Sequence, residues 1–448
     1  MIVSKLNFIP ARGCAVGMSF SRMMATKVKA VGLLDESLTL EASKDSFTGK
    51  AHPGKVYSAV ADLPNPLQRA IDKVCQDENK KVLFTEGEKL ARLLKDRFEP
   101  GKSTEKRKWK PTEYTKTKCL SYMLSRMPAE FSAVDRAFVE LSKWAPNFVP
   151  RTLYDFGSGV GSVPWAAISR WSKQLEEIHC IDSSKDMVNL AELLLKGGEA
   201  GGKFHVPQTY FRQLMSPTVN RTFDLVVSAH TLFEFPSLEA RLDAHINLWR
   251  KTKDYYVLVE LGTREGFKLI DEAKEFILFQ SKKEGQEMHI LAPCPHSLAC
   301  PRLLREGDRS PCNFESRYYK LWPESKGEAS KERFSFVILG KGRRKSPSPS
   351  WPRMVRAPMV RSGHVICSLC TPEGKLEDVT FTKSKDGRAS FLCARYSDWG
   401  DLVPVSLRQK EFDVRDKVKK ENISENSDDA QKSEHENVAA DEGRPLVN

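Results

Sequence analysis

The chain has 448 residues, of which 40% are hydrophobic and 29% are charged, as is typical of a folded water-soluble protein with two or three domains. No apolar run approaches the roughly 18 residues that a membrane-spanning helix requires, so we expect no membrane span. The net charge is +12, and because residues 421–448 carry −6, residues 1–420 carry +18. This excess favours a polyanionic partner such as RNA, and the alternative is a surface that is basic without such a partner.

The first thirty residues are basic and contain no acidic residue, since the first one in the chain is Asp35. Their Lys and Arg residues are interspersed with Ser, Met and Phe, without the continuous apolar stretch of a secretory signal. This pattern predicts a mitochondrial presequence over residues 1–30, and the alternative is a disordered basic N-terminus.

Residues 56–148 are predicted to form a helical N-terminal region, because apolar residues recur there at helical spacing. Within this region, residues 102–118 hold seven Lys or Arg residues against two Glu, with Trp109 and Tyr114 between them. Such a segment can neutralise phosphates and offer a face on which bases stack. The alternative is a solvated linker.

From residue 150 to about residue 280, strand patterns alternate with helical patterns. The predicted strands lie at residues 153–156, 178–182, 223–228 and 255–260, and the last helix lies around residues 267–279. Strands separated by helices are typical of a parallel sheet wrapped by helices. The fold class is therefore predicted to be α/β, with a Rossmann-like core over residues 150–280.

The first of these strands ends in a glycine loop that favours S-adenosylmethionine over a dinucleotide. Asp155 lies two residues before the first glycine, where a carboxylate attracts the ligand's ammonium group and would repel a pyrophosphate. The third glycine of the dinucleotide pattern is replaced by Ser162. The second strand ends at an acid, where a carboxylate accepts hydrogen bonds from ribose hydroxyls. The predicted cofactor-binding residues are Asp155, Gly157, Gly159, Gly161 and Asp182.

Two alternatives to catalysis stay open for this loop: a tight turn that binds nothing, and a pocket that binds the cofactor without chemistry. Methyl transfer needs a positioned acceptor and often a base. Residues 229–236, after the third strand, contain no evident nucleobase-binding motif. His230 and Glu234 lie there, but such residues are more often local hydrogen-bonding groups, so the catalytic residues stay unassigned.

The predicted C-terminal region, residues 281–405, combines cysteines with an edge strand at residues 334–339. It also holds a basic, proline-rich segment at residues 341–361, with seven Lys or Arg residues and no acidic residue. Beyond it, residues 408–448 are predicted to be a disordered acidic tail.

Six of the ten cysteines fall in the last third of the chain: Cys294, Cys300, Cys312, Cys367, Cys370 and Cys393. Without a secretory signal, this clustering indicates a metal site rather than disulfides. The spacing leaves zinc and an iron–sulfur cluster equally open, with His296 and His364 as alternative ligands. Unligated cysteines are the remaining alternative.

Several stretches together resemble the mitochondrial small-ribosomal-subunit methyltransferase-like family, over about residues 56–405. The similar stretches are residues 122–129, 146–150 leading into 153–161, 259–263 with Gly266 and Phe267, 292–296, 363–365 with 370–372, and 399–401. The resemblance implies an S-adenosylmethionine methyltransferase fold with a cysteine-bearing C-terminal insertion or extension. It also implies a location in the mitochondrial matrix and a role in assembling the small mitoribosomal subunit, through its ribosomal RNA and ribosomal proteins.

The resemblance further implies a [4Fe-4S] cluster, with zinc as the alternative, on Cys294, Cys300, Cys312 and Cys370. Cys370 is preferred to Cys367 because it directly precedes Thr371 and Pro372, as in the family. Little or no methyl transfer is expected, since residues 211–214 lack the acid with which active methyltransferases often contact adenine. The leading hypothesis is therefore an RNA-binding assembly factor, whose basic segments 102–118 and 341–361 contact ribosomal RNA. The competing hypothesis is an active ribosomal RNA methyltransferase.

Overall fold

The computed structural model describes residues 28–44, 46–56, 59–96, 112–216, 221–322, 327–344 and 350–411. Residues 31–408 form one unit, and the second unit consists of residues 1–30 and 409–448. The predicted presequence and the predicted acidic tail therefore lie almost wholly outside the described residues, as does most of the basic segment 102–118.

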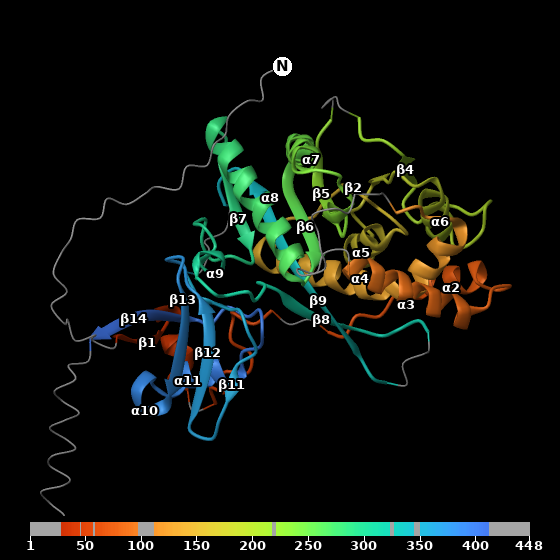
Figure 1. The fold of residues 1–448 in the computed structure, drawn as a ribbon. Coiled ribbons are helices and arrows are strands. Elements are labelled where there is room, and N and C mark those ends of the chain that lie inside the picture. Colours follow the sequence, from red (N-terminus) through yellow and green to blue (C-terminus); the bar gives the residue numbers. More distant parts are fainter. Residues whose placement is uncertain are drawn as a thin grey trace, which may run out of the picture. The chain divides into compact units, whose positions relative to one another are not determined.

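The main sheet has eight strands in the order β4-β3-β2-β5-β6-β9-β7, with β8 paired to β9 (Figure 1). Neighbours from β4 to β6 are parallel, whereas β9 is antiparallel to β6, β7 and β8. The central strands are buried along most of their length, as expected of parallel strands covered on both faces. The strands are β2 (Thr152–Phe156), β3 (Glu177–Ile181), β4 (Gln208–Arg212), β5 (Phe223–Ala229), β6 (Thr252–Leu261), β7 (Met288–Ala292), β8 (Phe314–Tyr318) and β9 (Ser330–Lys341).

Helices cover both faces of this sheet (Figure 1). On one face, α4, α5 and α6 bury side chains against Leu153, Leu225 and Val257. On the other face, α7 and α8 pack against Val226 and Tyr256, which point the opposite way along the same strands. These helices are α4 (Lys116–Trp144), α5 (Ser162–Trp171), α6 (Lys185–Leu195), α7 (Leu238–Lys251) and α8 (Arg264–Lys283).

The range predicted to be helical contains α2 (Asn65–Val74), α3 (Lys80–Asp96) and α4. The 29 residues of α4 are buried along most of the helix, including four charged side chains. Arg126 pairs with Glu332 of β9 at 3.2 Å, and Arg136 pairs with Glu140 at 3.0 Å. Because unpaired buried charges are costly, the Arg126–Glu332 pair fixes how α4 lies against β9, whereas Arg136 and Glu140 pair within the helix. Among the described helices, none is both long enough and apolar enough to cross a lipid bilayer.

The prediction of an edge strand at residues 334–339 is wrong. These residues belong to β9, which lies between β6 and β7 inside the sheet. The reason is that residues 281–333 contain two further strands, β7 and β8, which are short and show little periodicity in the sequence. The sheet therefore extends to Lys341, well beyond the boundary expected at residue 280.

A smaller sheet follows, in which β12 (His364–Cys370) pairs with β10 (Arg353–Met354), β11 (Met359–Val360) and β13 (Leu376–Thr382). All of these pairs are antiparallel. The remaining elements are β1 (Val28–Leu34), η1 (Glu36–Leu38), α1 (Thr39–Ala42), η2 (Leu232–Glu234), α9 (Pro301–Leu304), α10 (Lys383–Asp386), α11 (Arg388–Tyr396) and β14 (Val405–Glu411).

Candidate functional site

The glycine loop connects β2 to α5 at the carboxyl edge of the parallel strands. Gly157, Gly159 and Gly161 all have positive φ angles, of 75°, 49° and 90°. A Cβ on Gly157 would lie 2.0 Å from Oγ1 of Thr231, so only glycine fits there. A Cβ on Gly159 would meet no atom within 4 Å, because this glycine faces the open cavity.

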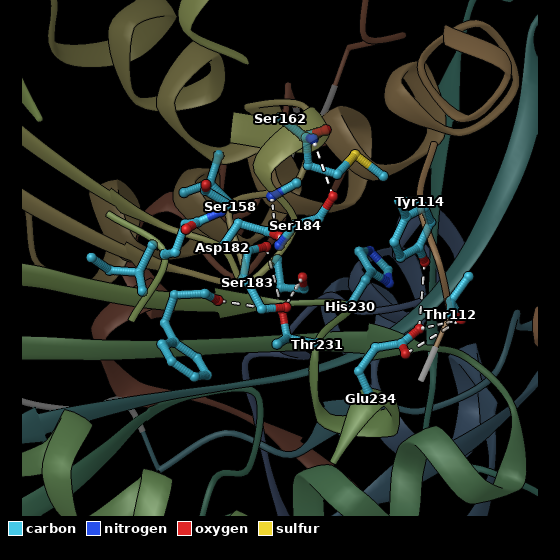
Figure 2. A pocket seen from close by; sticks show the side chains of 18 of the residues that line it. Thr112, Tyr114, Ser158, Ser162, Asp182, Ser183, Ser184, His230, Thr231 and Glu234 are labelled. Atoms are coloured by element: carbon cyan, nitrogen blue, oxygen red, sulfur yellow. Dashed lines mark hydrogen bonds between the residues drawn. The ribbon is translucent and has the colours of Figure 1, made fainter. Parts of the chain in front are cut away.

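The cavity beside this loop has a volume of about 600 Å³ (Figure 2), within the range of small-molecule sites. Three of the predicted cofactor residues, Gly157, Gly159 and Asp182, line it. Residues 213–215, which follow β4, line it as well. Its described lining contains four carboxylates (Glu113, Glu130, Asp182 and Glu234) and neither Lys nor Arg. Such a lining suits the cationic S-adenosylmethionine and disfavours a dinucleotide pyrophosphate.

Asp182 follows β3 and ties the two halves of the βαβ unit together. Its carboxylate accepts hydrogen bonds from the backbone N–H groups of Gly159 and Ser184, both at 2.8 Å. Each oxygen accepts one of these bonds, and each keeps a lone pair for a ribose hydroxyl. The geometry therefore fits the predicted role of Asp182.

Asp155 lies behind the loop and does not line the cavity. Its carboxyl group is fully buried, and neither oxygen has a hydrogen-bond partner among the described residues. Burial, and then the charge of Asp182, raise the pKa of Asp155 well above its usual value. An unsatisfied buried acid beside a cavity is a group that a cationic ligand would stabilise. The predicted attraction of the ammonium group would therefore act through space rather than by direct contact.

The opposite side of the cavity is formed by residues that the sequence analysis did not assign to the cofactor site. Tyr114 and Thr112, which precede α4, lie 3.4 Å or slightly more from Glu234 (Figure 2). Tyr114, which the sequence analysis places in a segment that could stack on bases or form a solvated linker, lines the cavity. The position of Tyr114 in a basic segment gave no signal of this role. Stacking of this segment on RNA stays a prediction.

His230, at the carboxyl end of β5, also lines the cavity and has a φ of 55°. It is the one non-glycine residue with positive φ in the part of the chain that the structure describes. The turn is held by Glu260 at the end of β6, which accepts a 2.7 Å bond from the Leu232 N–H. Burial raises the pKa of Glu260 to about 8. Sequence reasoning identified His230 but missed Glu260, which is the last residue of the strand predicted at residues 255–260.

Four cysteines that the sequence separates by up to 76 positions come together beyond the sheet. Cys294 follows β7, Cys300 precedes α9, Cys312 precedes β8 and Cys370 ends β12. Burial, and then charge on the other three thiols, raise the pKa of Cys370 above its ordinary value, so the four sulfurs interact electrostatically. All nine described cysteines are free thiols. In the described ranges, no three His, Cys, Asp or Glu side chains form a group that could hold a single metal ion.

The other predicted ligand candidates lie differently. For Cys367, burial raises the pKa to about 12, with no contribution from the four grouped thiols. His364 stands at the opposite end of β12 from Cys370. His296 lies beside Cys370, with Nε2 3.4 Å from Sγ.

The cysteine loops are held in place by two arginines. Arg353 is 2% exposed and donates to Glu140 of α4 at 2.7 Å, to the Gly400 carbonyl at 2.6 Å and to the Pro293 carbonyl at 2.9 Å. Arg356 donates to the Pro311 carbonyl at 3.3 Å. The expectation that the basic segment 341–361 contacts RNA is therefore wrong for Arg353, because its side chain is buried and paired with Glu140.

The strand order, the antiparallel β9 between β6 and β7, the glycine loop and the acid after β3 define the class. This chain is an α/β protein with the fold of S-adenosylmethionine-dependent methyltransferases, which confirms the predicted fold class. Residues 116–404 match the family model described as mitochondrial small ribosomal subunit Rsm22, so the chain belongs to the Rsm22 family.

Two curated relatives illustrate the family. The human ribosome assembly protein METTL17, mitochondrial, is 41% identical over 302 residues, which cover 66% of this chain and 65% of the human protein. The Rsm22-cox11 tandem protein 2, mitochondrial, of Schizosaccharomyces pombe is 29% identical over 44% of this chain and 31% of its own length. The chain thus spans less than two thirds of these relatives.

Among solved structures, the magnesium protoporphyrin IX methyltransferase of Synechocystis with bound S-adenosylmethionine matches 59% of this chain and 97% of its own. The identity is 12% and the TM-score is 0.31.

Proposed function

We propose that this chain is an assembly factor of the small mitoribosomal subunit, acting in the mitochondrial matrix. It binds ribosomal RNA and ribosomal proteins, keeps a pocket for S-adenosylmethionine, and performs little or no methyl transfer. The observation that carries this proposal is membership of the Rsm22 family over residues 116–404. A human relative that is 41% identical over 302 residues is named a ribosome assembly protein.

The proposal includes a [4Fe-4S] cluster on Cys294, Cys300, Cys312 and Cys370. The donor set fits this group, because one buried and three partly buried thiols that interact electrostatically would each ligate one iron. Deprotonation is costly for buried thiols, and iron would offset that cost. A bound cluster would supply cross-links between the β7–α9 connection, the α9–β8 connection and the end of β12, and a one-electron redox centre. Zinc is the alternative occupant, and it would require the thiols to move, because no group of described side chains could hold a single ion as they lie.

Ribosomal RNA would be bound by the exposed part of the basic segments. Within these two segments, the described basic residues with exposed side chains are Lys116, Lys118, Arg343 and Arg361. Arg343 already pairs with Glu287 at 3.3 Å, but this exposed pair is weak and is readily exchanged for a phosphate.

One experiment tests the proposal on the full chain: metal and sulfide analysis after anaerobic purification, paired with crosslinking to RNA in mitochondria. The proposal expects iron and acid-labile sulfide in equal amounts and crosslinks to the small-subunit RNA. A colourless, iron-free, zinc-loaded protein would contradict the cluster. Crosslinks confined to other RNAs, or none, would contradict the role in assembly.

Active ribosomal RNA methylation is the second candidate. The backbone conformation of His230, which lines the cavity, favours it. Residues held in sparsely populated backbone conformations cluster at functional sites, and His230 is such a residue. If methyl transfer matters, Asp182→Ala or Gly159→Arg removes a specific methyl mark from the RNA. If only binding matters, a folded pocket variant supports assembly with the methyl marks unchanged.

A further inference from the structure

Both ring nitrogens of His296 are engaged, one by its own loop and one by a cysteine. Nδ1 lies 3.1 Å from the backbone nitrogen of Leu298. Nε2 lies 3.4 Å from Sγ of Cys370. The residue is only 8% exposed, so water does not compete freely for either nitrogen.

These two contacts determine the tautomer of His296. A backbone N–H can only donate, so Nδ1 must accept the bond from Leu298 and carries no proton. An imidazole always carries a proton on at least one nitrogen, and that proton is therefore on Nε2. Nε2–H donates to the sulfur of Cys370. Because a protonated ring nitrogen has no lone pair for a metal, His296 is not a ligand in this arrangement.

The segment that carries His296 and the segment that carries Cys370 also touch at a second point. Gly374, in the turn that follows β12, lies against Leu298, and a Cβ on this glycine would lie 2.8 Å from Leu298 Cδ1. That turn is closed by a 2.9 Å bond from the Thr371 N–H to the Lys375 carbonyl. The two segments are thus in contact at a second point, and a backbone hydrogen bond closes the turn that follows Cys370.

We infer that His296 is a positioning residue that donates a hydrogen bond to the Cys370 thiolate of the proposed cluster and thereby raises its reduction potential. The inference rests on the cluster proposed above. A one-electron reduction adds negative charge that the ligand sulfurs share, so a donor to sulfur stabilises the reduced form more than the oxidised form. Such bonds to sulfur are among the features that set the potentials of these centres.

Two substitutions test the roles of the two ring nitrogens of His296 separately. In His296→Asn, the amide oxygen can still accept from Leu298, but the donor to Cys370 is lost. In His296→Gln, the longer side chain places an amide N–H near the former Nε2 and keeps the donor. His364→Asn is the matched control, because His364 lies at the opposite end of β12.

The experiment measures iron, sulfide and the midpoint potential of the full-length wild type and the three variants, purified anaerobically. We expect equal iron and sulfide in all four. We expect His296→Asn to have a more negative potential and a several-fold faster loss of the cluster in air, with His296→Gln close to wild type and His364→Asn unchanged. An unchanged potential in a fully loaded His296→Asn overturns the inference. Loss of iron from that variant under anaerobic conditions also overturns it, because His296 would then act as a ligand.

A second measurement does not need the cluster. Nitrogen-15 NMR of the imidazole side chains, with the His296 signals assigned from the His296→Asn variant, reports the tautomer directly. We expect the Nε2–H form in the metal-free protein, and the Nδ1–H form overturns the inference. Absence of iron and sulfide from the wild type refutes the cluster proposal itself, and the tautomer then decides separately whether the hydrogen bond exists.

Discussion

The glycine-loop pocket and the cysteine loops differ in how far apart along the chain their residues lie. The loop glycines and Asp182 belong to one βαβ unit, β2-α5-β3, and regular backbone geometry places them. The four cysteines come from the β7–α9 connection (Cys294 and Cys300), the α9–β8 connection (Cys312) and the end of β12 (Cys370). Side chains such as Arg353 and Arg356 hold these segments in place. A pocket made by regular elements is formed without its ligand. A site made by loops depends on buried polar contacts and, as proposed, on the group that it binds.

The largest effect is expected from Cys370→Ser, with Cys367→Ser as the matched control on the same strand. If the loops depend on a bound cluster, Cys370→Ser removes iron and lowers the free energy of unfolding by more than about 4 kcal/mol. Cys367→Ser, whose thiol does not interact with the grouped thiols, keeps its iron. Iron analysis and thermal unfolding measure both. Equal iron loss in the two variants would contradict the assignment of Cys370 rather than Cys367 as the ligand.

Arg353→Met tests whether a buried ion pair positions the cysteine loops. Removing one partner of such a pair is expected to cost roughly 3–5 kcal/mol, since Glu140 loses its 2.7 Å contact. Burial alone would raise the pKa of Glu140, but Arg353 and Arg136 outweigh it and lower that pKa. The pair therefore stabilises the fold above the ordinary pKa of Glu and loses this effect as pH falls through the lowered value.

Denaturant unfolding of Arg353→Met and wild type between pH 3 and pH 7 measures both expectations. The wild type should lose part of its stability toward acid, and the variant should lose less. Arg361→Met, at an exposed arginine, serves as the control and should change stability by less than about 0.5 kcal/mol. A loss in Arg361→Met as large as in Arg353→Met would show that burial is not the cause.

Gly157→Ala tests the pocket without touching the cysteines. The new Cβ would lie 2.0 Å from Thr231 Oγ1, and φ is positive, so the loop must shift at a cost of about 1–3 kcal/mol. Affinity for S-adenosylmethionine, measured by calorimetry, is expected to fall about tenfold or more. Gly197→Ala, with a similar φ and open space around it, shares the backbone strain but not the contact. If Gly197→Ala weakens binding equally, contact with Thr231 is not what matters.

The smallest effect is expected from Asp155→Asn. Burial, and then Asp182, raise the pKa of Asp155, so the wild type loses stability as pH rises from the ordinary Asp value to the raised one. The amide lacks this penalty and should stabilise the unliganded protein at pH 7 by at least about 1 kcal/mol, while weakening S-adenosylmethionine binding. Thermal unfolding at pH 4 and pH 7 checks this. A variant that is less stable than wild type at pH 7 would contradict the expectation.

The same contrast explains how much the sequence could predict. The strands of the βαβ units are apolar runs bounded by glycine or acid, and the structure reproduces them within a few residues. The partners of β9 could not be foreseen, because β7 and β8 are five-residue strands in a region with little periodicity. Nothing in the sequence distinguishes Arg353 from the other basic residues of its segment. Only its partner Glu140, 213 positions away, makes it structural. Tyr114 likewise belongs to a basic segment but faces the cavity.

One measurement tests the central claim most directly: recovery of assembled small mitoribosomal subunits in cells that lack the endogenous protein and express a variant. Cys370→Ser and Gly157→Ala are compared at equal protein levels in sedimentation profiles. The account predicts that Gly157→Ala restores small subunits and Cys370→Ser does not. Restoration by Cys370→Ser together with failure of Gly157→Ala would contradict it, because the pocket would then be the functional centre.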